Sequence, residues 1–306
     1  MSAYAFFEGK IVPIDQAKVS ILTHAFNYGT GCFEGIRAYW NDGEEQLLVF
    51  RLKEHYERMQ QSARILSLAP VYTVTEQVEA TLELLRRENY RQDAYIRPLL
   101  YKSGLGVGVQ MNNISDDFAI YTQPYGRYLE KEEGADVMVS SWRRNDDNAI
   151  PARAKATGAY LNSALAKTEA ALNGCDEAIV LNSDGHVSEG SAENLFIIRD
   201  GMLVTPPVSA NILEGITRAT VIQLAAEEMG IKTVERTVDR SELYIADEAF
   251  FCGTGVQIAA IASIDRRPVG EGRMGPMVSR IRDLYFQVVR GNHPRYRHWC
   301  TPVYAR

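Results

Sequence analysis

Residues 188–194 read Ser-Glu-Gly-Ser-Ala-Glu-Asn, and the apolar run Leu195 to Ile198 follows at once. Glu189 and Glu193 stand four residues apart among glycine and small residues, and the apolar run predicts a buried strand. A carboxylate beside such a buried strand could bind a protonated pyridine nitrogen. At ~4 Å and an effective dielectric near ~20, that attraction is about 4 kcal/mol, or roughly three pK units in favour of the protonated ring. Taken alone, Glu189 is more often a surface turn carboxylate.

Upstream of this stretch, Lys155 lies among small residues, with Ala154 before it and Ala156, Thr157 and Gly158 after it. It stands between a proline-marked loop and an expected helix start, where a large planar ligand could approach its amine. A single lysine in such a context is more often a surface charge. Lysine is scarce in this chain, and a functional interpretation of Lys155 depends on the neighbouring motifs.

Two downstream segments offer donors for a phosphate. Gly215-Ile216-Thr217 opens an expected helix, which supplies unpaired N–H groups, a hydroxyl and the positive end of the helix dipole. Gly253-Thr254-Gly255 is a flexible turn of N–H groups at an expected strand end. Each is also an ordinary helix start or turn. The run Gly104-x-Gly106-x-Gly108 does not complete G-x-G-x-x-G, which argues against a dinucleotide fold.

Composition narrows the class of protein. The chain has 306 residues, 46 % hydrophobic content and a formal net charge of -6. This length can bury two cores, and the absence of a basic run argues against a nucleic-acid binder. No apolar run approaches the roughly 20 residues of a membrane span, and Met1 to Lys10 has no leader pattern. We expect a cytoplasmic protein whose partners are small molecules, not nucleic acid or membrane.

The cysteines and histidines predict neither disulfides nor a metal site. No C-x-x-C pair occurs among the four cysteines, which we expect to be reduced: Cys32, Cys175, Cys252 and Cys300. No H-x-x-x-H spacing occurs among the five histidines: His24, His55, His186, His293 and His298.

The first half of the chain predicts an α+β domain over residues 1–129, followed by a linker at 130–136. Hairpin strands at 3–7 and 10–12 precede strands at 32–40, 47–50 and 94–101, in which Pro98 suggests an edge or a bulge. Two helices are expected: one buries Leu52, Tyr56, Met59, Ala63 and Leu66, and the other follows a Thr73-x-x-Glu76 capping box and has Val74, Val78, Leu82 and Leu85 on one face. Strands and helices do not alternate as in a doubly wound sheet.

Residues 137–306 predict a second, larger domain. It begins with a strand at 137–142, and helices are expected at 159–173 and from Gly215 to near Gly230. Strands at 232–237, 249–253 and 257–264 precede a last helix with Pro276 in its first turn.

Seven pieces of the chain together resemble class IV (fold type IV) pyridoxal-phosphate transaminases, most closely the branched-chain amino acid aminotransferases. The likeness covers about Tyr4 to Arg290. It implies an α/β (α+β) fold with a smaller N-terminal α+β domain and a larger C-terminal domain with a mixed, barrel-like sheet. The seven pieces are Phe33-Glu-Gly-Ile-Arg37, Val49-Phe-Arg51, Tyr95-Ile-Arg97, Lys155 with Gly158-x-Tyr160-Leu-Asn162, Ser188-Glu-Gly-x-x-Glu-Asn194-Leu-Phe196, Gly215-Ile-Thr-Arg218 and Gly253-Thr254.

The resemblance implies roles for single residues. Lys155 would be catalytic and would carry pyridoxal 5'-phosphate covalently, with Glu189 on the pyridine nitrogen and Tyr160 on the ring hydroxyl oxygen. Glu193 would support the floor of the cofactor site. The phosphate ligands would be Arg51, Ile216, Thr217 and Thr254, and Arg218 would be less useful if it pointed outward.

The same resemblance implies a substrate site for two unlike side chains. Tyr95 and the amides of Thr254 and Gly255 would take the α-carboxylate, and Arg97 the side-chain carboxylate of glutamate. Gly35 would also be one of the substrate-binding residues. Leucine, isoleucine or valine would enter an apolar pocket formed by Tyr28, Phe33, Tyr125, Tyr128 and Tyr160.

The expected reaction moves an amino group from a branched-chain L-amino acid to 2-oxoglutarate in a homodimer or assembly of dimers. Rivals are a D-amino acid or R-amine transaminase, a lyase on an aminated chorismate derivative, and an inactive scaffold on this fold. Gly255-Val256-Gln257 departs from the usual Ala-Ala-Glu, and Tyr125 replaces a tryptophan of some relatives. The tail from Gly291 to Arg306 has no counterpart and is expected to be a surface or subunit-contact extension.

Overall fold

The structure is a computed structural model that describes residues 2–126, 131 and 134–304. It contains two compact units, which are described separately. Unit 1 consists of Met1–Gly126, Ala154–Gly158 and Gln287–Arg306, and unit 2 of Arg127–Arg153 and Ala159–Phe286. Sequence alone placed residues 154–158 and 287–306 in the second domain, and the domain limits 1–129 and 137–306 stay a prediction.

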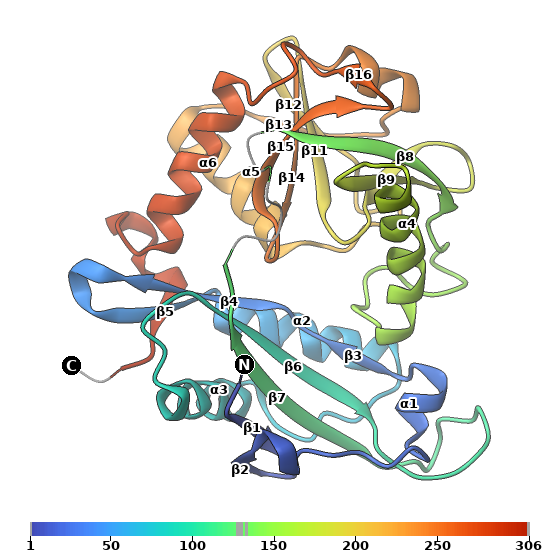
Figure 1. Cartoon of the computed structure of the whole chain (residues 1–306), viewed down its shortest axis with the longest axis vertical. Helices are drawn as coiled ribbons and strands as arrows, with labels where there is room; N and C mark the ends of the chain where they lie inside the picture. The colour runs from blue at the N-terminus through green and yellow to red at the C-terminus, as the bar shows by residue number, and fades with distance from the viewer. Residues whose placement is uncertain (1, 127–130, 132–133, 305–306) are drawn as a thin grey trace. The chain divides into compact units, whose positions relative to one another are not determined.

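Unit 1 is built on one eight-stranded sheet with the order β17-β5-β4-β6-β7-β1-β2, to which β3 adds by pairing with β6. Helices α2 and α3 pack on this sheet (Figure 1). The strands are β1 (Tyr4–Phe7), β2 (Lys10–Pro13), β3 (Gly31–Phe33), β4 (Ile36–Asn41), β5 (Gln46–Phe50), β6 (Ala94–Lys102), β7 (Asp116–Pro124) and β17 (Cys300–Pro302). The helices are α1 (His24–Tyr28), α2 (Leu52–Ile65) and α3 (Val74–Glu88), with short 3-10 turns η1 (Ile14–Gln16), η2 (Asp42–Glu44) and η5 (Pro294–Trp299).

The helices form largely as their sequences predict. The expected face of α2 is buried from Leu52 to Ala63, and the capping box at Thr73 and Glu76 is present. Helix α3 differs, because it buries Gln77 and Thr81 in addition to Leu84 and Leu85. The Thr81 hydroxyl there is bonded to the Tyr56 hydroxyl. A polar pair between the two helices thus replaces part of the expected apolar face.

The expectation that Pro98 marks a sheet edge or a bulge is wrong. Strand β6 lies inside the sheet, and Pro98 pairs in regular register with Ile120 of β7. On the other side of β6, β3 and β4 pair with its two ends and leave Glu34 and Gly35 between them. The Pro98 carbonyl accepts a hydrogen bond from the Glu34 amide there. The nitrogen of Pro98 therefore meets a break between two strands, where no ladder bond is lost.

The tail is part of the core sheet of unit 1 and not a mere surface extension, while a subunit contact there stays a prediction. Residues 300–302 form β17, which pairs antiparallel with β5 and places Cys300 opposite Phe50. Tyr296 and Trp299 are buried. The tail thus completes one edge of the sheet of unit 1.

Unit 2 has a nine-stranded mixed sheet with the order β10-β9-β8-β15-β14-β11-β12-β13, with β16 beside β15. The pairs β8·β9 and β12·β13 are parallel, and α4 and α5 lie in their respective connections. The strands are β8 (Ala135–Arg143), β9 (Glu177–Leu181), β10 (Val187–Gly190), β11 (Asn194–Arg199), β12 (Met202–Thr205), β13 (Thr233–Glu235), β14 (Glu248–Gly253), β15 (Gln257–Ile264) and β16 (Arg267–Pro268). The helices are α4 (Tyr160–Leu172), α5 (Ile216–Met229) and α6 (Pro276–Val289), with the 3-10 turn η4 (Arg240–Ile245). The last residues of α6, 287–289, and the first two of the 3-10 turn η3 (Thr157–Ala159) belong to unit 1.

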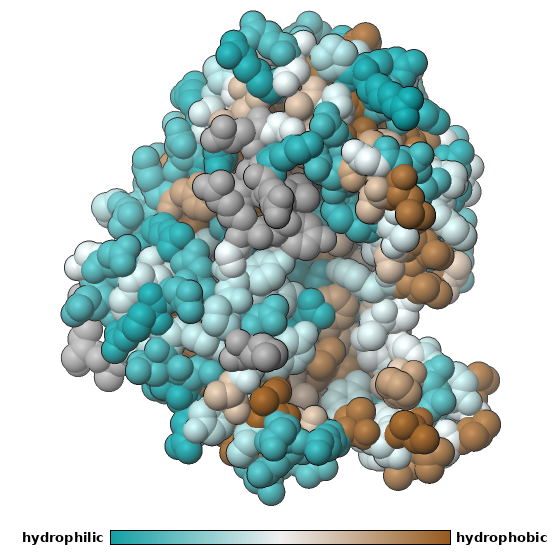
Figure 2. Space-filling view, in the orientation of Figure 1, coloured by the Kyte–Doolittle hydropathy of each residue, from teal (hydrophilic) through white to brown (hydrophobic). Residues whose placement is uncertain are grey.

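Unit 1 carries an exposed apolar surface around α1 and the loop between β6 and β7 (Figure 2). We call it the α1 surface. Its residues are Ile21, Leu22, Phe26, Leu105, Val107 and Val109. No described helix is long and apolar enough to cross a membrane.

Candidate active site

Lys155 is held in unit 1 by backbone contacts on two sides. Its carbonyl accepts a hydrogen bond from the Phe33 amide at 3.1 Å, and its own amide donates to Ser62 Oγ at 3.2 Å. Ser62 lies on α2, and Ala156 forms a bridge with Cys32 of β3. The half-buried lysine is therefore fixed at its backbone by a strand and by a helix.

The ring of Phe33 lies close to two cations. Lys155 Nζ is 5.1 Å from the ring centre, and the Arg97 guanidinium carbon is 4.3 Å from it. The negative face of an aromatic ring attracts cations at such distances. Unit 1 thus brings the predicted catalytic lysine near one predicted arginine and one predicted aromatic residue of the substrate pocket.

Tyr95 joins this group through Arg97 and Gly35. Its hydroxyl accepts hydrogen bonds from Arg97 Nε at 3.1 Å and Nη2 at 2.7 Å. A Cβ atom added to Gly35 would lie 2.5 Å from this hydroxyl, so only glycine leaves room for it. The Tyr125 ring stands 5.1 Å from the Tyr95 ring, with the Arg37 guanidinium 4.9 Å from its centre.

A buried ionic cluster lies behind the lysine segment. Arg58 donates two hydrogen bonds of 2.7 Å to the carboxylate of Glu34, and His55 Nδ1 lies 2.8 Å from the same group. The cation and the imidazole contact lower the pKa of Glu34 well below its usual range, against the effect of burial. Burial lowers the pKa of His55, so the neutral ring donates to Glu34. We call these three residues the Glu34 cluster; it was not predicted from the sequence.

Glu189, in β10 of unit 2, is buried and well supplied with donors. Arg144 Nη2 is 2.6 Å from Oε1, and Oε2 accepts hydrogen bonds from Asn194 Nδ2 at 2.9 Å and the Leu213 amide at 3.1 Å. Three donors favour an ionised carboxylate. Arg144 and Leu213 were missed as partners of Glu189, since only folding brings them to it.

Glu193 has the opposite electrostatic environment. Burial, together with the charge of Glu177, raises its pKa to about 8, although Ala192 donates an amide hydrogen bond to Oε2 at 3.0 Å. The β10–β11 corner thus combines a well-satisfied carboxylate at 189 with one that favours its neutral form at 193.

The start of α5 is a donor site in unit 2. Gly215 is the N-cap, and the first amides of a helix have no partner within it. Ile216 and Thr217 are buried there. Asn194 Oδ1 would lie 2.0 Å from a Cβ atom at Gly215, so the helix start needs glycine. Arg218 does not point outward: it is buried and pairs with Glu235 at 2.5 Å.

The remaining predicted residues lie at several places. Thr254 and Gly255 form the turn between β14 and β15, and Tyr160 is the first residue of α4. Arg51 follows β5 and is the N-cap of α2. Tyr128 lies outside the described residues.

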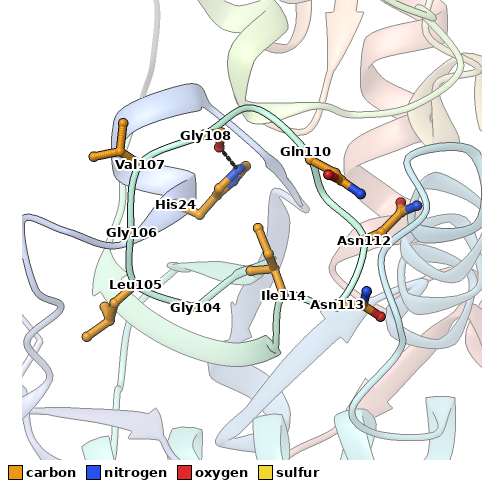
Figure 3. Close-up of a pocket in the computed structure, with 10 residues that line it drawn as sticks. All are labelled: His24, Gly104, Leu105, Gly106, Val107, Gly108, Gln110, Asn112, Asn113 and Ile114. Carbon is orange, nitrogen blue, oxygen red and sulfur yellow. Dashed lines mark hydrogen bonds between the residues drawn. The ribbon is translucent and has the colours of Figure 1, made fainter.

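Tyr28 contacts a loop of unit 1. The centre of its ring lies 4.7 Å from that of the His24 ring, and its hydroxyl accepts a hydrogen bond from the Gly108 amide at 3.0 Å. His24 also bonds the Gly108 carbonyl at 2.9 Å, beside a hollow of about 330 Å³ (Figure 3). This hollow is lined by His24 and loop residues between Gly104 and Ile114, none of which was predicted for catalysis or cofactor binding.

Known proteins resemble this chain over most of its length. The model of the family described as Amino-transferase class IV matches residues 31–264. The branched-chain-amino-acid aminotransferase of Escherichia coli (strain K12) is 42% identical over 304 residues, which cover 98% of this chain and 97% of that protein.

Two solved structures are similar over nearly the whole chain. One is the branched-chain aminotransferase of Thermoproteus uzoniensis with norvaline, at 45% identity and a TM-score of 0.95, covering 99% of this chain and 100% of that chain. The other is the branched-chain amino acid aminotransferase of Thermobaculum terrenum in its PLP-form, the holo-form, at 41% identity and a TM-score of 0.95, covering 99% of each chain. The two-domain α/β fold expected from the sequence is thus confirmed.

Proposed function

Because the chain belongs to the class IV aminotransferase family, we propose that it moves the amino group of leucine, isoleucine or valine to 2-oxoglutarate, giving the 2-oxo acid and L-glutamate. The relatives named for branched-chain substrates, one of them solved with norvaline, support this choice. The observation in this chain that carries the proposal is the amine of Lys155, 5.1 Å from the Phe33 ring that also contacts Arg97.

The cofactor is pyridoxal 5'-phosphate, which when bound draws electrons away from the substrate Cα. The donor sets of the chain suit such a group. The open amides at Ile216 and Thr217 fit a phosphate, as does the cationic side chain of Arg51, and Thr254 adds a further donor. Glu189 would face the ring nitrogen, with Tyr160 on the ring hydroxyl oxygen and Glu193 beneath.

Lys155 holds the cofactor in the resting enzyme and moves a proton during turnover. The amine freed by the incoming substrate would take the proton from the substrate Cα and deliver it to carbon C4' of the cofactor. The backbone bonds to Phe33 and Ser62 hold the lysine in place. The three donors on Glu189 keep that carboxylate charged, which favours a protonated ring nitrogen.

Residues of contrasting chemistry bind the different groups of the substrate. Tyr95 and the amides of Thr254 and Gly255 take the α-carboxylate, and Arg97 takes the second carboxylate of glutamate. The same site accepts an aliphatic side chain through its aromatic residues, among them Phe33 and Tyr125. Tyr28, Tyr128 and Tyr160 complete this set, and Gly35 makes room for Tyr95.

The chain also acts as a homo-oligomer, a dimer or an assembly of dimers. The α1 surface supports this state, since Val107 is 94% and Val109 is 78% exposed and both belong to one apolar area. Soluble monomers rarely expose such patches without a partner.

The first test is the identity of the cofactor-bearing residue. Borohydride reduction of the holoenzyme, followed by peptide mapping, should place the cofactor adduct on Lys155. Lys155→Ala should lose essentially all turnover, whereas Lys53→Ala, at a lysine whose side chain is 73% exposed, should keep it. An adduct on a different lysine would overturn the assignment.

A substrate panel separates the proposed reaction from its closest rival. L-valine, L-leucine, L-isoleucine, D-alanine and R-phenylethylamine are each supplied with 2-oxoglutarate. The three L-amino acids should react fastest. Greater activity with the D-acid or the amine would favour a D-amino acid or R-amine transaminase, although an amine leaves Arg97 without a second carboxylate to bind.

A further inference from the structure

The C-terminal segment reaches the residue that we assign to the cofactor phosphate. Strand β17 pairs with β5, and β5 ends at Phe50, directly before Arg51. Trp299, the last residue before β17, accepts a hydrogen bond from the Arg51 amide at 2.7 Å through its carbonyl. The two residues are 248 positions apart in sequence, so this contact is not visible from any local pattern.

The same tryptophan packs on the side chain of Arg51. The guanidinium carbon lies 3.9 Å from the centre of the Trp299 ring. An arginine that stacks on an indole is attracted through its flat face, while its N–H donors lie in the plane of the group. Stacking thus fixes the plane of the guanidinium without using the donors that would bind a phosphate.

The backbone of Arg51 also needs support. It has a φ of 48° and a ψ of 44°, in the left-handed region that disfavours residues with a side chain. Such a conformation persists where its surroundings enforce it. The Trp299 carbonyl supplies part of that restraint. On the other side, Glu54 lies 3.7 Å from Arg51 Nε but is 41% exposed, so it restrains the arginine less than a buried partner would.

Trp299 is itself held rigidly. It is 6% exposed and stacks on Tyr296 with ring centres 4.4 Å apart, and its ring meets the edge of Phe50 at 6.2 Å. The tryptophan is therefore a fixed surface against which the arginine rests.

We propose that Trp299 is a positioning residue for Arg51, and that the C-terminal segment thereby sets the affinity for the phosphate of the cofactor. This inference rests on the proposed role of Arg51 as a phosphate ligand. Losing the indole face frees the guanidinium to adopt other orientations, which weakens binding of a phosphate without altering contacts to the rest of the cofactor.

The test compares two noncovalent probes, pyridoxamine 5'-phosphate and pyridoxamine, which differ only in the phosphate. Their dissociation constants are measured by calorimetry on cofactor-free enzyme. Trp299→Leu should weaken binding of the phosphorylated probe about 10-fold and leave pyridoxamine unchanged. Trp299→Phe, which keeps an aromatic face and guards against misfolding of the leucine variant, should lose about two- to three-fold. Trp40→Leu, a matched control in the same sheet, should change neither constant.

A double-mutant cycle isolates the coupling to Arg51. Arg51→Gln should remove most of the preference for the phosphorylated probe, and adding Trp299→Leu should then cause no further loss. If Arg51→Gln loses that preference but Trp299→Leu and Trp299→Phe keep it, the positioning role is wrong and the phosphate role stands. If Arg51→Gln keeps the preference, the phosphate role is wrong and the inference falls with it. Equal weakening of both probes by Trp299→Leu would mean a general structural role and would also overturn the inference.

Discussion

The missing side chain at Gly35 makes room for the Tyr95 hydroxyl. A Cβ atom there would lie 2.5 Å from Oη and 3.2 Å from Cζ, and a tyrosine ring is too stiff to bend away locally. Gly35→Ala should therefore displace Tyr95 and raise KM for amino acid substrates about 10-fold, with a smaller effect on cofactor affinity. Steady-state kinetics with leucine and glutamate check this. Gly43→Ala is the control, since its nearest contact would be an ordinary 3.5 Å; equal effects of the two substitutions would contradict the prediction.

Glu193 should make stability depend on pH in an unusual direction. Its pKa is about 8 in the folded chain and near 4.5 in the unfolded chain, so between these values the folded state holds a proton that the unfolded state lacks. This contribution to stability is complete below about pH 4.5 and is lost as the pH rises towards 8, at up to about 1.4 kcal/mol per pH unit.

The variant that checks this is Glu193→Gln, which resembles the protonated acid. The difference in unfolding free energy between variant and wild type should grow in favour of the variant from pH 5.5 to pH 7.5, as measured by urea unfolding of cofactor-free protein. A difference that stays constant over this range would show that Glu193 is ionised in the folded chain.

Candidate site residues could be named where a short motif carried them, and their roles stay a prediction. Lys155, Glu189 and Thr217 could be selected because small residues or a helix start surround each of them in sequence. The partners that hold these residues were not predictable. Arg144 and Leu213 reach Glu189 from positions 45 residues before and 24 residues after it, and no local periodicity marks such contacts.

At the scale of elements, the Glu34 cluster ties α2 to the corner between β3 and β4. Arg58→Met would leave a buried carboxylate facing a neutral histidine and should cost about 3–5 kcal/mol of stability. Urea unfolding measures the loss. Arg64→Met, on the exposed side of the same helix, should cost less than about 0.5 kcal/mol. A loss at Arg58 no larger than that at Arg64 would show that the pair is not needed.

This element also bears on the lysine segment. Ser62 lies one turn after Arg58 on α2, and its Oγ accepts a hydrogen bond from the Lys155 amide. The helix that the Glu34 cluster fixes is therefore the helix that supports the predicted catalytic residue.

Elements were predicted well when one local pattern governed them. The capping box of α3 and the apolar face of α2 are set within a few turns of chain. Pro98 misled because a proline is normally confined to edges, whereas here the break between β3 and β4 removes the need for its missing donor. The tail misled for a similar reason: three residues form a strand only because β5 lies beside them.

At the scale of the whole molecule, the chain passes between its units more often than a division by sequence suggests. Residues 154–158 join unit 1 through β3 and α2, and the tail joins it through β5. Both pairings are distant in sequence, so composition and linkers cannot reveal them. The predicted catalytic lysine consequently belongs to a unit whose other segments come from the two ends of the chain.

The exposed apolar residues of the α1 surface predict that the whole molecule self-associates. A symmetric interface uses the same patch on both copies, so one substitution removes two contacts. Leu105→Asp together with Val107→Asp should therefore raise the dissociation constant of the oligomer by about 100-fold or more, because burying each apolar side chain contributes about 1.5–3 kcal/mol. Sedimentation equilibrium compares this variant with wild type and with Met202→Asp, which alters an exposed apolar residue of unit 2. If the wild type sediments as a monomer, the predicted self-association is wrong. If the wild type is an oligomer that the two aspartates do not weaken, the contact lies outside the α1 surface.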